Sequence, residues 1–106
     1  MKSRLDTDLT RMLGINFPII QAPMFLVSNA KMLIEASNAG ITGCVPAMNY
    51  RTIKELRAAI LDVKEHSNGP MGINLIVNKF NTQMQKQLDV CVELEVDYII
   101  TSLGNP

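Results

Sequence analysis

The residues whose types suggest chemistry lie where predicted strands end. Residues 18–24 form a short apolar run that stops at Ala22-Pro23. Proline has no N–H to donate and fixes its own φ, so Pro23 must end sheet pairing there. The run therefore presents backbone groups of Gln21, Ala22 and Met24 at the carboxyl end of a strand, which is where parallel α/β folds bind ligands. Taken alone, the run is equally consistent with a buried strand that meets a turn.

Asn74 is the unusual residue within a predicted strand, in the segment Gly-Ile-Asn-Leu. An asparagine is disfavoured there, because a buried side-chain amide without partners costs roughly 1–3 kcal/mol. The amide must therefore be satisfied either by neighbouring backbone or by a ligand, and the residue types leave both open. Our hypothesis is that Asn74 and the proline-closed tip of the first strand converge on one crevice.

The two cysteines and the single histidine show no metal-binding or nucleophile pattern. Cys44 and Cys91 lie far apart without CxxC spacing, so we predict two small apolar core residues rather than a disulfide. His66 follows a predicted helix, whose dipole favours an imidazolium at that end. One histidine cannot supply a His-rich site, and we predict no metal.

Composition and charge limit the classes of function. The 106 residues are 47% hydrophobic, 19% charged and 5% aromatic, with a formal net charge of zero. Lys and Arg are scattered, which argues against a nucleic-acid partner, since nucleic-acid binding needs clustered basic charge. The amino terminus lacks a signal-peptide pattern, and no apolar run approaches the ~20 residues of a membrane span. We expect a cytoplasmic protein with a small-molecule substrate and no membrane partner.

Apolar patterning predicts four strands that alternate with helices. The strands are expected at residues 18–22, 41–45, 71–77 and 97–101. They are continuous apolar runs, typical of parallel strands covered on both faces, and they recur at the spacing of βα units. The sequence therefore predicts an α/β fold, a parallel β-sheet with flanking helices.

Capping residues and apolar spacing delimit the helices. A short helix over residues 9–13 is expected first, and a second from Ser28 or Asn29 to residue 39. Thr52 and Glu55 have capping-box spacing at the start of a third helix, which ends before Ser67. The last helix is expected over residues 82–95, with a buried face made of Met84, Leu88, Cys91 and Val92.

Four segments resemble the nitronate monooxygenase family, formerly called 2-nitropropane dioxygenases. They are residues 19–24, 37–40, 71–75 and 101–106, with the sequences IIQAPM, SNAG, MGINL and TSLGNP. The flavin-dependent enoyl-ACP reductases of bacterial fatty-acid synthesis share this pattern. The four motifs occur in the family's order at βα spacing, and together they indicate the superfamily more specifically than the reaction.

The resemblance implies a TIM-type (β/α)₈ barrel that holds FMN at the carboxyl face of its strands. Residues 1–106 would form one domain segment, the (βα)₄ amino-terminal half. By resemblance, the backbone at Ala22, Pro23 and Met24 lies along the flavin ring, Asn74 hydrogen-bonds the ring, and the loop at Ser102 borders it.

Two departures and one expected gap qualify the resemblance. Phe25-Leu26 stands where small residues are usual, and Cys44-Val45-Pro46 replaces a more Gly-rich turn; both could reshape the substrate side of the pocket. A full barrel takes about 250 residues, with its phosphate site after the last two strands. The FMN phosphate site and the family's catalytic histidine are therefore expected later in sequence, and His66 does not match that histidine. The catalytic residues stay unknown.

Two classes of function stay open. The first is an FMN-dependent oxidoreductase that oxidises alkyl nitronates with O₂, with enoyl-ACP reduction as the alternative enzyme. The second is a non-catalytic half-barrel fragment. Its first and fourth strands would be unpaired edges, and such edges favour self-association.

Overall fold

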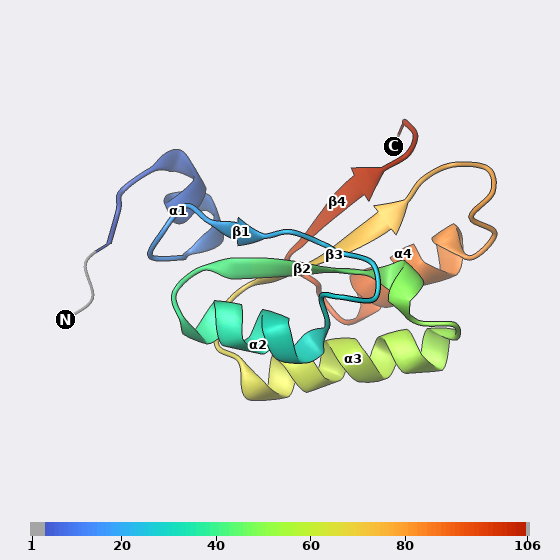
Figure 1. The fold of residues 1–106 in the computed structure, drawn as a ribbon, viewed down its shortest axis with the longest axis horizontal. Helices are drawn as coiled ribbons and strands as arrows, with labels where there is room; N and C mark the ends of the chain where they lie inside the picture. Colours follow the sequence, from blue (N-terminus) through green and yellow to red (C-terminus); the bar gives the residue numbers. More distant parts are fainter. Residues whose placement is uncertain (1–3, 106) are drawn as a thin grey trace.

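Four parallel strands in sequential order organise the protein (Figure 1). The structure is a computed structural model that describes residues 4–105. The sheet order is β1-β2-β3-β4, and each neighbouring pair is parallel. The predicted α/β fold is confirmed. The elements are α1 (Asp8–Leu13), β1 (Ile20–Gln21), α2 (Ala30–Asn38), β2 (Thr42–Pro46), the 3₁₀ helix η1 (Ala47–Asn49), α3 (Ile53–His66), β3 (Met71–Ile76), α4 (Met84–Glu93) and β4 (Tyr98–Ser102).

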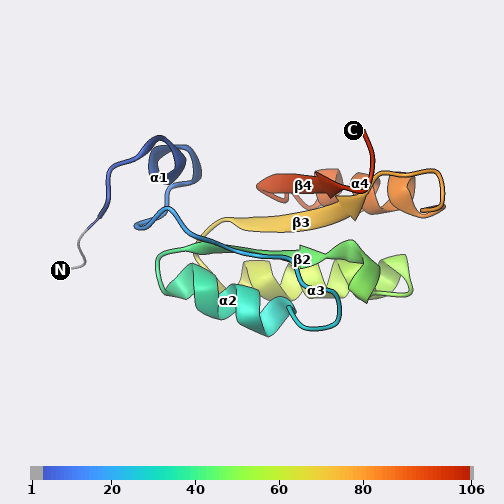
Figure 2. The same ribbon diagram turned by 45° about the horizontal axis from the view of Figure 1, so that its top comes forward.

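Helices α2, α3 and α4 contribute to one core on one face of the sheet, and Figure 2 shows α2 and α3 lying beneath it. Val45, Ile73 and Leu75 from the central strands belong to this buried cluster with Leu33 of α2 and Ile60 of α3. Burying each such side chain contributes roughly 1.5–3 kcal/mol. The core therefore lies between the sheet and these helices. None of the helices in the described part of the chain has the length and hydropathy of a membrane span.

The opposite face of the sheet is covered by no helix of residues 4–105. Tyr98 lies flat over Gly72, where an added Cβ would meet the tyrosine ring at 2.2 Å. The Tyr98 hydroxyl donates to the Gly43 carbonyl at 2.9 Å. Strand register and side-chain alternation place a set of ten residues on this bare face: Ile20, Thr42, Cys44, Pro46, Gly72, Asn74, Ile76, Tyr98, Ile100 and Ser102.

The predicted cover on both faces is correct for β2 but wrong for the two edge strands. All five residues of β2 are buried, whereas Ile20 in β1 is 36% exposed and β4 has no buried residue. β1 pairs only at Ile20 and Gln21, which is shorter than the predicted residues 18–22. Pro18 and Pro23 bracket it, and neither has an N–H to extend the ladder. β2 is displaced by one residue from its prediction, and β3 ends one residue early.

The predicted capping box of α3 is half formed. The Glu55 N–H donates to Thr52 Oγ1 at 3.1 Å, as expected. The Glu55 carboxylate instead accepts from the Arg51 N–H at 3.1 Å, one residue before the cap. The Glu55 carboxylate therefore still fixes the start of α3, but it accepts from the N–H of Arg51 instead of that of Thr52.

The predicted buried face of α4 is wrong at Val92, which is 69% exposed while Val90 is 4% exposed. The buried face runs through Gln87, Val90 and Cys91, at the three-and-four spacing of one helix stripe. Val92 follows Cys91 by one residue and so is rotated about 100° away from the core. Gln87 is tolerated there because its Oε1 accepts from Asn81 Nδ2 at 3.0 Å.

Candidate functional site

The loops that follow the four strands meet at one rim, because all four strands run in the same direction. Ala22, Pro23 and Met24 follow β1, and Ser102 ends β4. Asn74 lies within β3, at the level of Pro46 and Ile100 in the register, and two residues before the level of Ser102. The five residues predicted to contact a cofactor thus lie toward the carboxyl ends of β1, β3 and β4. β2 separates the first group from the second, so the two groups are about 10 Å apart at the ~4.8 Å strand spacing.

Asn74 and Ser102 form a direct hydrogen-bonded pair. Asn74 Nδ2 donates to Ser102 Oγ at 3.1 Å and to the Ile100 carbonyl at 2.9 Å. Both amide hydrogens are thereby used, which offsets the cost of placing an asparagine in a strand. Within residues 4–105, Asn74 Oδ1 accepts no hydrogen bond, and the Ser102 hydroxyl still has a proton to donate. The pair therefore keeps one acceptor and one donor uncommitted.

The loop after β1 is held by Ser28, whose side chain is fully buried. The Met24 N–H donates to Ser28 Oγ at 2.8 Å, and Ser28 Oγ donates to the Met24 carbonyl at 3.1 Å. The Ala22 carbonyl accepts from Gln21 Nε2. The Ala22 and Met24 backbone groups, which the sequence predicted to be available to a ligand, are therefore partly used in hydrogen bonds within the protein. The helix cap itself is Asn29, whose Oδ1 accepts from the backbone N–H of the third helical residue at 2.9 Å.

A second clamp comes from Asn49, which follows β2. Asn49 Oδ1 accepts from the Leu26 N–H at 2.7 Å, and Asn49 Nδ2 donates to the Ser28 carbonyl at 2.7 Å. Leu26 has a φ of 59°, and Leu103 after β4 has a φ of 62°. This left-handed conformation costs a residue other than glycine about 1–2 kcal/mol. Backbone strain of this kind is typical of functional sites. Nothing in the sequence pattern pointed to Asn49 or to a clamping role for Ser28.

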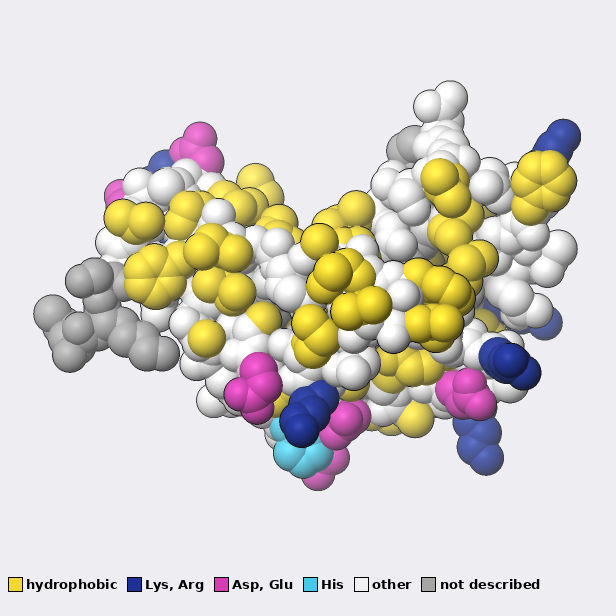
Figure 3. Space-filling model, viewed as in Figure 1, with side chains coloured by type: hydrophobic (Ala, Val, Ile, Leu, Met, Phe, Trp, Pro, Cys, Tyr) yellow, Lys and Arg dark blue, Asp and Glu magenta, His cyan; other side chains and the backbone are white. Residues whose placement is uncertain are grey.

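The same rim exposes large apolar side chains in the loop after every strand. Figure 3 shows hydrophobic side chains across the whole view, from the α1 end of the molecule to the ends of the strands, with charged side chains gathered along the lower edge, over α2 and α3. A surface patch that gathers apolar side chains usually marks a binding site. The exposed rim residues are Met24, Phe25, Leu26 and Val27 after β1, Met48 after β2, Phe80 after β3 and Leu103 after β4.

The thiols and the histidine lie outside this rim. Cys44 and Cys91 are free and buried, as predicted, and burial raises the pKa of the Cys44 thiol to about 12 and that of Cys91 to about 11. Both stay protonated near neutral pH and are poor nucleophiles. His66 ends α3, at the opposite end of the sheet, and a hydrogen bond to the Asp62 carbonyl raises its pKa. Among residues 4–105, no three His, Cys, Asp or Glu side chains gather as a metal site would need.

The family model described as nitronate monooxygenase matches residues 6–104. The chain belongs to the nitronate monooxygenase family. A probable nitronate monooxygenase from Staphylococcus haemolyticus is 34% identical over 84 residues, which are 79% of this chain and 23% of that protein. A nitronate monooxygenase from Pseudomonas aeruginosa is 39% identical over 70 residues, or 66% of this chain and 20% of that protein.

A relative from Mycobacterium tuberculosis has a different named activity. It is a (3aS,4S,5R,7aS)-5-hydroxy-7a-methyl-1-oxo-octahydro-1H-indene-4-carboxyl-CoA dehydrogenase, 38% identical over 72 residues, 68% of this chain and 20% of that protein. This chain thus spans between 20% and 23% of the length of these curated relatives. The family is one of oxidoreductases, and its relatives include more than one named reaction.

Solved structures confirm the fold class. FabK from Thermotoga maritima, a TIM barrel, superimposes with a TM-score of 0.86 and 25% identity, over 96% of this chain and 32% of that chain. The enoyl reductase domain of MlnA from Bacillus amyloliquefaciens gives a TM-score of 0.76 at 23% identity, over 92% of this chain and 23% of that chain. The four strands and the helices that connect them therefore have the architecture of half a TIM barrel, and the bare sheet face corresponds to the barrel interior.

Proposed function

We propose that this chain supplies one side of the FMN site of an oxidoreductase that oxidises alkyl nitronates with O₂. The observation that carries the proposal is the Asn74–Ser102 pair, which keeps an uncommitted acceptor and donor at the strand ends. The polar edge of a flavin ring alternates N–H and carbonyl groups, so a neighbouring acceptor and donor match it. The half-buried amide of Asn74 then has a function beyond its bonds to β4.

The residues of the β1 loop fit the apolar part of such a ring. Pro23 and Met24 are partly exposed, and the Met24 backbone is fixed by Ser28. A platform fixed before binding loses little entropy when a flat ligand lies on it. Phe25 and Leu26 project from the same loop and would narrow the substrate side. Bound FMN would carry electrons from the nitronate to O₂, while the chain's residues bind and orient the ring.

The acid–base residue and the phosphate contacts are proposed to come from the other half of the barrel. His66 lies at the amino-terminal end of the sheet, and both thiols stay protonated. Residues 1–106 would then be one half of an FMN-binding barrel domain. This division predicts that flavin binding by the chain depends on Asn74 while turnover needs more of the protein.

FMN titration of the chain tests the cofactor assignment. Visible circular dichroism and flavin fluorescence should report binding, and Asn74→Ala should weaken it roughly tenfold through loss of a hydrogen bond to the ring. Ser67→Ala is the matched control, because the Ser67 hydroxyl is buried with no hydrogen-bond partner in residues 4–105 and lies at the opposite end of the sheet. Absence of binding, or equal binding by the Asn74→Ala and Ser67→Ala variants, would remove the cofactor proposal.

Oxygen uptake by the whole protein tests the reaction. We expect consumption of O₂ with an alkyl nitronate and no added NAD(P)H. The alternative is an enoyl reductase, which the superposition on FabK favours. Strict dependence on NAD(P)H, with reduction of an enoyl thioester, would establish that alternative and contradict the nitronate assignment.

If the chain is instead a non-catalytic half-barrel, we propose that the 106-residue chain associates with itself. β1 and β4 each have one neighbour in the sheet, and Ile20 is exposed on the bare face. Unpaired edges favour pairing with a second chain. Sedimentation velocity should show a dimer, and a well-folded monomer at micromolar concentration would contradict this.

A further inference from the structure

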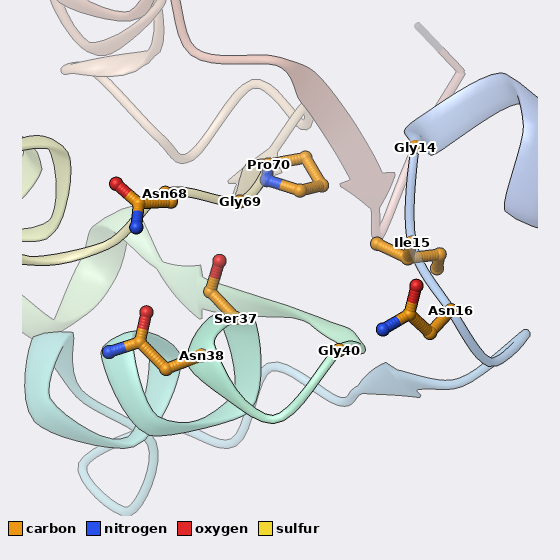
Figure 4. A pocket seen from close by; sticks show the side chains of 9 residues that line it. All are labelled: Gly14, Ile15, Asn16, Ser37, Asn38, Gly40, Asn68, Gly69 and Pro70. Atoms are coloured by element: carbon orange, nitrogen blue, oxygen red, sulfur yellow. The ribbon is translucent and has the colours of Figure 1, made fainter. Parts of the chain in front are cut away.

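A polar cavity of about 240 Å³ lies at the amino-terminal rim, at the end of the sheet opposite Asn74 and Ser102 (Figure 4). Helices α1, α2 and α3 all end close to it, since Gly14 caps α1, Asn38 ends α2 and Asn68 lies two residues after α3. No charged side chain is among the residues that line it. These are Gly14, Ile15, Asn16, Ser37, Asn38, Gly40, Asn68, Gly69 and Pro70.

The lining contains a buried hydroxyl without a partner. Ser37 is 8% exposed, and within residues 4–105 its Oγ has no hydrogen-bond partner. In Figure 4 the Ser37 side chain points toward Gly69, in the segment that leads into β3. Gly69 passes so close that an added Cβ would lie 2.1 Å from Ser37 Oγ. Buried polar groups are normally hydrogen-bonded, so the unpaired Ser37 hydroxyl is available to a group bound in the cavity.

Asn38 adds an acceptor beside Ser37. Its Nδ2 donates to the His66 carbonyl at 3.4 Å, which links the ends of α2 and α3. The side-chain oxygen of Asn38 is therefore left to accept a hydrogen bond. Two acceptors, one buried and one nearer the surface, thus line the same side of the cavity.

The end of α2 gives the cavity a negative potential. A helix carries partial negative charge at its carboxyl end, and a basic residue in the last turn normally offsets it. α2 has no basic residue in its last turn, whereas α1 has Arg11 and α3 has Lys64 and His66. The uncompensated end of α2 therefore disfavours an anion and favours a cation beside Ser37 and Asn38.

We propose that this cavity binds a small organic cation through a primary ammonium group, with Ser37 Oγ and Asn38 Oδ1 accepting from its N–H groups. A bare metal ion fits poorly, because the volume far exceeds the roughly 30 Å³ of a water-sized group and no carboxylate lines it. The ammonium satisfies the buried hydroxyl and offsets the uncompensated end of α2. The site lies at the other end of the sheet from the proposed flavin site and does not depend on it.

Amide NMR of the ¹⁵N-labelled chain tests the proposal with ethylammonium chloride as the probe. The resonances of Gly14, Gly40 and Gly69 should shift and saturate in the millimolar range expected for so small a ligand. Ethanol, the neutral analogue, and sodium chloride, the ionic-strength control, should leave them nearly unmoved. Equal shifts with ethanol or with sodium chloride would overturn the ammonium assignment, as would the absence of saturation.

Two variants and a matched control separate binding from folding. Ser37→Ala should weaken ethylammonium binding about tenfold, the effect of losing one hydrogen bond to a charged group. Ser67→Ala removes the other unpartnered buried hydroxyl near the same loop, in a neighbouring cavity, and should leave the affinity unchanged. Asn38→Asp, at an exposed position, should strengthen binding about fivefold by adding a nearby charge. Equal losses in the two serine variants, or no gain in Asn38→Asp, would overturn the proposal.

Discussion

A double-mutant cycle on Asn74 and Ser102 tests how the carboxyl rim is built. Asn74→Ala removes the hydrogen bonds of Nδ2 to Ser102 Oγ at 3.1 Å and to the Ile100 carbonyl at 2.9 Å. Each is worth about 1 kcal/mol net, so the free energy of unfolding should fall by about 2 kcal/mol. Ser102→Ala removes only the first bond and should cost about 1 kcal/mol.

The double variant should be no less stable than Asn74→Ala, because Ser102 has no bond left to lose once the amide is gone. The coupling energy between the two positions is then about 1 kcal/mol. Urea unfolding followed by far-ultraviolet circular dichroism, without flavin, measures all four chains. Ser67→Ala deletes a buried hydroxyl for which residues 4–105 provide no hydrogen-bond partner; it should leave stability unchanged and serves as the control. Additive losses, with coupling below about 0.3 kcal/mol, would refute the hydrogen-bonded pair.

Three further outcomes are expected. Ser28→Ala should lower stability by about 1–3 kcal/mol and speed hydrogen exchange of the loop after β1, because the Met24 N–H loses its buried acceptor. Val92→Lys should change the free energy of unfolding by less than about 0.5 kcal/mol, whereas Val90→Ala should lower it by about 1–3 kcal/mol. A larger loss in the Val92 variant would support the helix face predicted from sequence. Because burial raises the pKa of the Cys44 thiol from 9.0 to about 12, the unfolded chain releases that proton first as pH rises. Stability should therefore be fully present below pH 9.0 and fall between there and about 12, and a Cys44→Ala variant should lose that part of the pH dependence.

The sequence predicted the elements whose determinants are local. Continuous apolar runs and their spacing were sufficient for four parallel strands. Residue types also predicted the Pro23 stop and a helix cap at Ser28 or Asn29, and the structure has Asn29 as the cap. What covers a strand is not local. The pattern of β1 and β4 is that of strands covered on both faces, but no helix of residues 4–105 packs on the second face. The pattern therefore anticipates a cover that the described chain does not provide.

Register explains why the site was only half predictable. Asn74 was identified because its type conflicts with its strand, but its partner is set by the pairing of Ile76 with Ser102, which no single segment encodes. Ser28 and Asn49 were missed as clamps for the same reason. Asn49 bonds to groups that lie 21 and 23 residues away in sequence, and Ser28 bonds back to Met24 within its own loop. Residue types can show that a polar group needs a partner, and only the fold decides which one it finds.

The hydrogen bond from Asn49 fixes an exposed apolar loop at the carboxyl rim. Leu26 is 70% exposed and held at positive φ by a side chain from another loop, although apolar residues in a free loop gain nothing from being fixed in solvent. Closing the barrel would cover Ile20 and Ile100 on the sheet face, but the Leu26 loop projects beyond the strand end and needs a different cover. In the proposed flavin site, the ordering of this loop would prepare the rim for a ligand. Removing the clamp with Asn49→Ala should cost more in ligand affinity than in stability, since it frees a surface loop while leaving the core unchanged. Titration and urea unfolding of the same variant measure both, and a loss confined to stability would show that the clamp serves only the fold.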